Sequence, residues 1–150
     1  MRQQQKPYNG RHNRPDSQAR QNGQLSEEEK EKILAGDAAT IDEVAEWFAK
    51  ELKRLNRTQM RNFYTPFTRI RATPDEQERR KAIIQHRART AYLAAREKEA
   101  KPIWDLFEGL LRKADSNTKI DALCDLAEAL IAYHRRESSE PGEREQRSEE

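Results

Sequence analysis

The stretch IDALCDLAEALIAYHRR, residues 120–136, carries apolar side chains almost all the way round a helix. Spacings of three and four residues form two stripes, one of Ile120, Leu123, Ala127, Leu130 and Ile131, the other of Leu126, Ala129 and Tyr133. A helix that is apolar on nearly every side packs at the centre of a bundle rather than at its edge. We therefore predict a central helix that follows Ser116 and reaches about Arg136.

Helix-start signals recur upstream of this segment. Ser26 with Glu29 and Thr40 with Glu43 each predict a capping box, the first for a helix that ends near Gly36 and the second for a helix of about 40–55. A third helix is predicted from Thr58 to about Arg71, a fourth with Thr73 as cap and Pro74 at its first position, and a fifth opened by Pro102. Pro66 interrupts the third, which predicts a kink or a restart with Thr65 as cap. Gly and β-branched residues are scarce, so the sequence predicts an all-α fold, a compact bundle of about five to six helices.

The two ends of the chain differ in composition from the middle. Residues 1–25 are basic and rich in Gln, Asn and Arg, and residues 137–150 are acidic and lack aliphatic side chains. Both predict disordered tails around one domain, 26–136. The sequence has no long apolar run or secretory signal pattern, and its single Cys124 excludes an intrachain disulfide. We expect a cytoplasmic protein without a membrane segment.

Charge is segregated along the chain, although the net charge is only +2. Residues 53–96 contain twelve basic and three acidic residues, whereas the segments on either side, 26–52 and 97–150, are acidic. A basic segment of this kind can form a positive face on a nearly neutral body. The pattern indicates a polyanion as partner.

The residues that could carry catalysis do not form a recognisable set. Of the three histidines, His12 lies in the basic tail, His86 in an arginine-rich helix and His134 at a helix end, where the dipole favours its cation. Cys124 has the spacing of a buried apolar residue. Core packing is also the favoured interpretation for the aromatic residues at helical spacing, Trp47, Trp104, Phe63 and Phe107. The sequence predicts no catalytic residues, no metal site, no cofactor and no enzymatic activity.

Arg61 is unusual because a cation near a helix start opposes the macrodipole. With Thr58 as cap, Arg61 occupies the third helical position, beside Gln59 and downstream of Lys53, Arg54 and Arg57. These side chains and the free amides of the first turn together suit a phosphate. Pairing of Arg61 with a carboxylate such as Glu51 is an equally good interpretation of the local sequence.

Three segments carry a family resemblance: TQMRNFYTPFTRI (58–70), ARTAYLAAR (88–96) and EALIAYHRR (128–136). They are similar, in this order, to the small-subunit family of the type III-A CRISPR effector, the Csm complex. The matching positions are Gln59, Arg61, Phe63, Tyr64, Tyr92, Arg96, Glu128, Ala129, Ala132, Tyr133 and His134. Pro66 and the missing glycine before Arg96 depart from the family pattern.

The resemblance implies a helical bundle without catalytic chemistry that lines a ribonucleoprotein filament. Its implied partners are guide RNA, target RNA, the backbone and large subunits, and other copies of itself. RNA would be held through phosphates, which position it without reading its sequence. The candidate RNA-binding residues are Lys53, Arg54, Arg57, Gln59, Arg61, Arg69, Arg89 and Arg96.

Two other functions remain open from the residues. A helix-turn-helix DNA regulator also has short capped helices and a basic one, but LNRT (55–58) lacks the glycine of a tight turn and Pro66 interrupts the candidate recognition helix. A protein adaptor would bind no polyanion at all.

Overall fold

The structure is a computed structural model that describes residues 24–138. Within that range it contains six α-helices, a short 3-10 turn (η1, Lys98–Ala100) and no strand. The helices are α2 (Glu27–Leu34), α3 (Ala38–Glu51), α4 (Arg57–Ala72), α5 (Glu76–Arg96), α6 (Lys101–Lys113) and α7 (Asn117–Ser138). The all-α prediction is therefore confirmed. The two predicted tails and His12 fall almost wholly outside the described residues.

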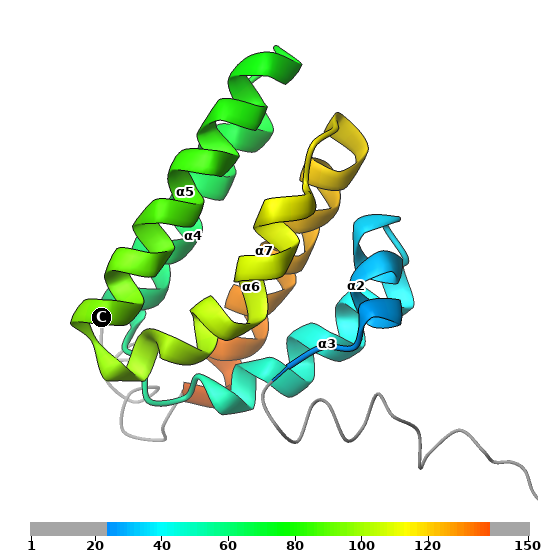
Figure 1. The fold of residues 1–150 in the computed structure, drawn as a ribbon. Coiled ribbons are helices and arrows are strands. Elements are labelled where there is room, and N and C mark those ends of the chain that lie inside the picture. The colour runs from blue at the N-terminus through cyan, green and yellow to red at the C-terminus, as the bar shows by residue number, and fades with distance from the viewer. Residues whose placement is uncertain (1–23, 139–150) are drawn as a thin grey trace, which may run out of the picture.

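Helix α7 is the centre of the bundle, as predicted. It contacts each of the other five α-helices. Figure 1 shows α4 and α5 side by side on one flank, α2 and α3 on the other, and α7 between them behind α6. Its two apolar stripes supply Ile120, Leu123, Leu126 and Leu130 to the core, each essentially without exposed surface. The near-continuous apolar character of residues 120–136 thus follows from burial on several sides.

The core includes an aromatic cluster between α4, α5 and α6. Phe63 and Phe67 of α4 meet Phe107 of α6, with ring centroids 4.8 Å and 5.9 Å apart, respectively. The expected core roles of Phe63 and Phe107 are confirmed. Trp47 packs against the core while half-buried, and Trp104 is half-buried beneath the Arg87 guanidinium.

Two helix starts agree with the sequence. Ser26 and Glu29 form the predicted capping box, in which each side chain bonds the other's backbone amide. Ser116 precedes α7, and its hydroxyl accepts a hydrogen bond from the Lys119 amide at 3.4 Å. These two helix starts can be predicted because the capping residue and the first apolar residue together fix where the helix begins.

Three other predicted caps are wrong. The threonines Thr40, Thr58 and Thr73 are not the caps; Asp37, Asn56 and Asp75 are. Each true cap lies two or three residues from the threonine and is Asp or Asn, whose side-chain oxygen reaches the amide of the third helical residue. Helix α3 therefore begins earlier than predicted, at Ala38, and α5 later, at Glu76.

Thr73 instead ends the preceding helix. Its hydroxyl donates to the Arg69 carbonyl at 2.8 Å, and its backbone amide bonds the Ile70 carbonyl at 3.1 Å. Helix α4 also runs unbroken through Pro66, so the predicted restart with Thr65 as cap is wrong. Burial of Phe63 and Phe67 on either side of Pro66 offsets the backbone hydrogen bond that proline removes.

The capping box of α4 gives a direct stability test. Asn56 accepts from the Gln59 amide at 2.8 Å, and the Gln59 side chain accepts from the Asn56 amide at 2.9 Å. We expect Asn56→Ala to lower the free energy of unfolding by about 1 kcal/mol, because the first-turn amide loses its acceptor. The measurement is urea unfolding followed by circular dichroism. Thr58→Ala, at the residue first expected to cap, is the matched control and should be near neutral.

Candidate nucleic-acid interface

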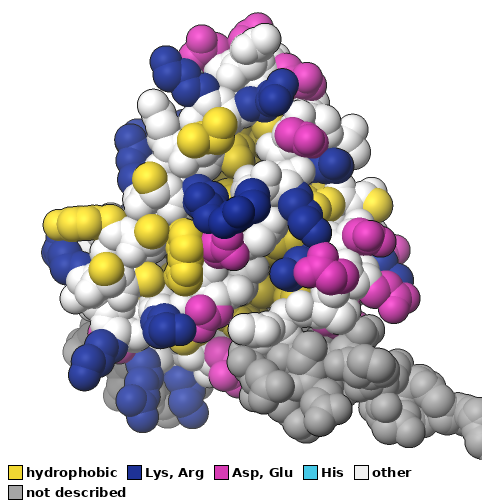
Figure 2. Space-filling model, in the orientation of Figure 1, with side chains coloured by type: hydrophobic (Ala, Val, Ile, Leu, Met, Phe, Trp, Pro, Cys, Tyr) yellow, Lys and Arg dark blue, Asp and Glu magenta, His cyan; other side chains and the backbone are white. Residues whose placement is uncertain are grey.

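Helices α4 and α5 form a side of the molecule whose surface is basic. Residues 57–72 and 79–96 contain no Asp or Glu. The two helices pack against each other, so the exposed side chains of these acid-free segments lie on adjoining parts of the surface. Figure 2 shows Lys and Arg side chains along the flank formed by α5, whereas Asp and Glu gather toward α2. The charge segregation seen in the sequence therefore becomes a spatial segregation.

Some of these arginines hold the fold together. Each of them reaches an acid on a neighbouring helix, which neutralises its charge within the protein. The pairs are Arg71 with Asp125 (2.6 Å), Arg79 with Asp121 (2.5 Å) and Arg87 with Glu108 (2.9 Å). These three arginines point toward α6 or α7 and are not available as an open cationic surface.

A second set of cations on the same helices is exposed and forms no ion pair with any residue between 24 and 138. The set is Arg61, Arg69, Arg80, Lys81 and Arg89. We call it the open cation set. An exposed arginine without a carboxylate nearby keeps all its donors for an external anion. Ion pairing within the protein thus separates the structural arginines from those that could bind an external anion.

Arg69 and Arg89 are brought together although they lie twenty residues apart in the chain. Both line a groove between α4 and α5, along with Pro66, Ile70, Thr73, Ala82 and Gln85. Pro66 has no backbone N–H, and no acidic residue lines the groove. Two arginines that line one such groove can contact successive phosphates of one strand.

Arg61 occupies a different place from the one predicted. Because Asn56 caps α4, Gln59 takes the third helical position and Arg61 lies in the second turn, away from the free amides. The predicted anion site built from Arg61 and first-turn amides is therefore wrong. Arg61 instead lines a groove on the α7 side of α4 with Tyr64, and pairing with Glu51 is not seen either.

Sequence reasoning missed Arg135 at this second groove. Arg135 follows the buried His134 on α7 and lies in the same groove as Arg61, near Glu128. Charge counting gives no signal for Arg135, because it lies outside the basic segment 53–96 in a stretch that is acidic overall. Arg80 and Lys81 are also exposed but absent from the predicted set, although Lys81 lies two residues from the buried Ile83 and so on the opposite side of α5.

The remaining candidates occupy the end of the bundle where α3 meets α4. Lys53 and Arg54 are exposed in the connecting turn, and Arg57 is half-buried at the first position of α4. Gln59 is engaged twice, in the capping box and through its side-chain amide, which donates to the Glu97 carboxylate.

Arg96 approaches the same end from α5. Its guanidinium lies 3.7 Å from the Glu97 carboxylate and 5.8 Å from the centre of the Tyr92 ring. Glu97 therefore joins the end of α5 to the start of α4, because it also accepts from Gln59. Gln59 and Arg96 thus share one carboxylate, while Arg61 faces the other side of α4.

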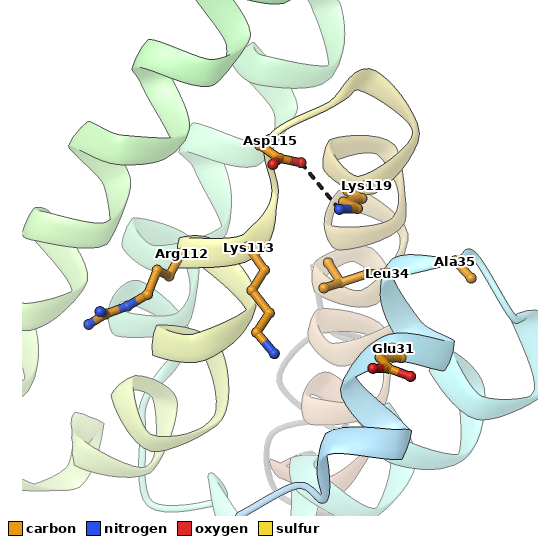
Figure 3. Close-up of a pocket in the computed structure, with 7 residues that line it drawn as sticks. All are labelled: Glu31, Leu34, Ala35, Arg112, Lys113, Asp115 and Lys119. Atoms are coloured by element: carbon orange, nitrogen blue, oxygen red, sulfur yellow. Dashed lines mark hydrogen bonds and ion pairs between the residues drawn. The ribbon is translucent and has the colours of Figure 1, made fainter.

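A pocket elsewhere in the molecule carries cations but is internally neutralised. It lies between α2, α6 and the start of α7, and Figure 3 shows Lys119 bonded to Asp115 and Arg112 pointing away from Leu34. Its three cations are each paired, Lys119 with Asp115, Lys113 with Glu27 and Arg112 with Glu108. This pocket is a poor anion site compared with the α4–α5 groove.

The histidines are placed for packing. His134 is buried, and its Nε2 lies 2.9 Å and 3.0 Å from the carbonyls of Leu52 and Leu55. Burial lowers its pKa, so the expected preference for the cation is wrong. His86 is buried between Phe63 and Phe67, and burial lowers its pKa to about 4.

Cys124 behaves as a buried apolar residue. Burial raises the pKa of its thiol to about 11, and its sulfur lies 3.6 Å from the Phe67 carbonyl. A thiol of this kind is protonated at neutral pH and is a poor nucleophile. Among residues 24–138 there is no group of three or more His, Cys, Asp or Glu side chains that could hold a metal ion. No helix in that range is long and apolar enough to cross a bilayer.

The fold and this surface define a small helical-bundle protein with an acid-free, basic side. The family model described as Csm2 Type III-A matches residues 35–140. The chain therefore belongs to the Csm2 type III-A family, as the resemblance implied, and is a small subunit of a type III-A CRISPR effector complex. Comparison with curated proteins gives no match, and comparison with solved structures gives none.

Proposed function

We propose that this subunit holds guide RNA and target RNA in the effector complex by contacting their phosphates through the α4–α5 side, without catalysing a reaction itself. The observation that carries the proposal is the open cation set on two helices that lack acidic residues between 57 and 72 and between 79 and 96. Such a surface attracts a polyanion of any sequence. Sequence selection would then rest on base pairing between guide and target.

The proposed contacts have a centre and a periphery. Arg69 and Arg89 form the centre because they face one acid-free groove. The periphery consists of Lys53, Arg54, Arg57, Gln59, Arg61 and Arg96, together with Arg80 and Lys81 of the open cation set. Gln59 contributes mainly by fixing Glu97 beside Arg96, since its own polar groups are already bonded within the protein.

The partners follow from the family and the surface together. Backbone and large subunits of the complex, and further copies of this chain, would contact faces other than the α4–α5 side. The subunit would work in the cytoplasm, where guide RNA and its targets meet. Cleavage of the target would be the work of neighbouring subunits.

The central test is a charge reversal in the assembled complex. We expect the double variant Arg69→Glu/Arg89→Glu to weaken RNA binding at least about tenfold at moderate salt, because two phosphate contacts become repulsive. The slope of log affinity against log salt should become shallower by about 1.4, at about 0.7 per phosphate on single strands. Filter binding over a salt series with several unrelated RNA sequences measures both quantities.

The matched control has the same change in charge on another part of the molecule. Lys32→Glu/Arg112→Glu places two acids on α2 and α6, where each cation now pairs with an acid of its own helix. This variant should bind RNA within about twofold of wild type, because it has the same net charge as the first double variant but keeps the α4–α5 side unchanged. Equal losses for both double variants would show that only net charge matters, and the proposed interface would be wrong.

A further inference from the structure

Tyr92 is exposed in a molecule that buries most of its aromatic rings. Its side chain is 65% exposed. Among the described residues, Ile84 is the only other large hydrophobic residue that is exposed to this extent. By contrast Phe63, Phe67 and Phe107 are almost completely buried. An exposed aromatic ring on a well-packed helix is available for contacts outside the bundle.

The surroundings of Tyr92 are cationic. Arg89 precedes it by three residues and Arg96 follows it by four, so all three lie on one face of α5. The Arg96 guanidinium lies 5.8 Å from the centre of the Tyr92 ring. Figure 2 shows hydrophobic and cationic side chains interleaved over this flank. Interleaved aromatic and basic groups are typical of surfaces that bind single-stranded nucleic acid.

An acid beside Arg96, Glu97, is held in place by a contact with α4. Glu97 lies 3.7 Å from the Arg96 guanidinium, and its other carboxylate oxygen accepts from the Gln59 side chain. Glu97 thereby positions Arg96 beside Tyr92 from the side of α4. Arg89 has no such partner between residues 24 and 138 and also lines the groove that contains Arg69. The ring therefore adjoins the proposed phosphate path.

We propose that Tyr92, Arg89 and Arg96 form a subsite for one unpaired nucleobase of the bound RNA. The base would stack on the Tyr92 ring while the two arginines contact the phosphates on either side of that nucleotide. This inference rests on the proposed function, since it places one nucleotide of the RNA held there. Stacking tolerates any base, because every base has an aromatic face.

The chemistry selects an unpaired base over a paired one. Inside an A-form duplex both faces of a base are covered by its neighbours, and a side chain cannot reach them. A protruding tyrosine gains its full stacking contact only with a base that is splayed out or single-stranded. The α4–α5 side would then bind the phosphates of both single-stranded and duplex RNA, and contact with Tyr92 would favour the single strand.

The test compares two RNA probes on the assembled complex. One is a short single-stranded oligonucleotide with a fluorescent adenine analogue, and the other is the same strand in a perfect RNA duplex. We expect Tyr92→Ala to weaken binding of the single strand about tenfold, the usual scale of base stacking on an aromatic side chain. Duplex binding should change less than about twofold, and Tyr92→Phe should retain the wild-type preference. The analogue's fluorescence should be quenched on binding to wild type but not to Tyr92→Ala.

The controls separate this inference from the function on which it rests. Ile84→Ala removes the other exposed hydrophobic side chain and should leave both affinities unchanged. If Tyr92→Ala binds both probes like wild type while Arg69→Glu/Arg89→Glu still fails, the stacking subsite is wrong and the phosphate interface stands. If Tyr92→Ala weakens both probes equally, selection of an unpaired base is wrong. If wild type binds neither probe, both proposals are wrong.

Discussion

Replacement of Arg79 by alanine is expected to lower the free energy of unfolding by about 2 to 4 kcal/mol. Arg79 is only 5% exposed, and its guanidinium makes three contacts. They are Nε to the Ile70 carbonyl at 3.0 Å, one terminal nitrogen to Asn117 at 2.8 Å and the other to Asp121 at 2.5 Å. Alanine would leave these acceptors without a donor and open a cavity between α4, α5 and α7. Asp121 is half exposed, so water replaces part of the loss.

The neighbouring Arg80 provides the matched control. It is exposed and forms no ion pair with another residue of 24–138, so Arg80→Ala should change stability by less than about 0.5 kcal/mol. Arg79→Lys should recover only part of the loss, because one ammonium cannot reach three acceptors in the plane of a guanidinium. Urea unfolding of the three variants measures these differences. Equal stabilities for Arg79→Ala and Arg80→Ala would contradict the structural role of Arg79.

Acidification is expected to destabilise the bundle through His86. Neither ring nitrogen of His86 forms a hydrogen bond of normal geometry within residues 24–138. Burial lowers its pKa from 6.5 to about 4; the nearby Phe63 backbone opposes this shift and Arg89 adds to it. The unfolded chain therefore takes up a proton near pH 6.5 while the folded protein does not. Stability from neutral His86 is complete above pH 6.5 and is lost as pH falls toward 4, by about 3 kcal/mol.

A His86→Leu variant isolates this contribution from other acid effects. Leucine suits the space between Phe63 and Phe67 and has no proton to gain, so its stability should depend less steeply on pH between 6.5 and 4. His134, whose pKa is also lowered, remains in both proteins and contributes equally. Unfolding free energies at several pH values give the difference between the two curves. Parallel curves would show that His86 titrates normally in the folded protein.

The arrangement of the bundle was predictable where apolar patterning was unambiguous. Residues 120–136 are apolar on nearly all sides, and only a central position satisfies such a helix. The helix starts were less predictable because several Asp, Asn and Thr residues lie within three positions of one another. Asp37 and Asn56 prevail over Thr40 and Thr58, since Asp and Asn are the stronger caps and the register places their oxygen at the free amide.

The candidate interface was predictable in part. Charge counting located the basic segment 53–96, but charge alone cannot separate Arg79, which is buried and paired, from Arg80, which is exposed. That distinction depends on acids supplied by α6 and α7, which lie distant in sequence. The true cap of α4 lies two residues before the predicted one, so Arg61 falls in the second turn and not the first, and the anion site inferred for it is lost.

The central place of α7 has a consequence for synthesis of the chain. A ribosome delivers α2 through α6 before the helix on which they pack. Helices α2 and α3 make their main contacts with each other and with α7, so their apolar stripes stay uncovered until residues 117–138 emerge. Folding of this subunit therefore waits for its last described helix. A nascent chain halted before Asn117 would expose the apolar face of α3, which chaperones and other chains could bind.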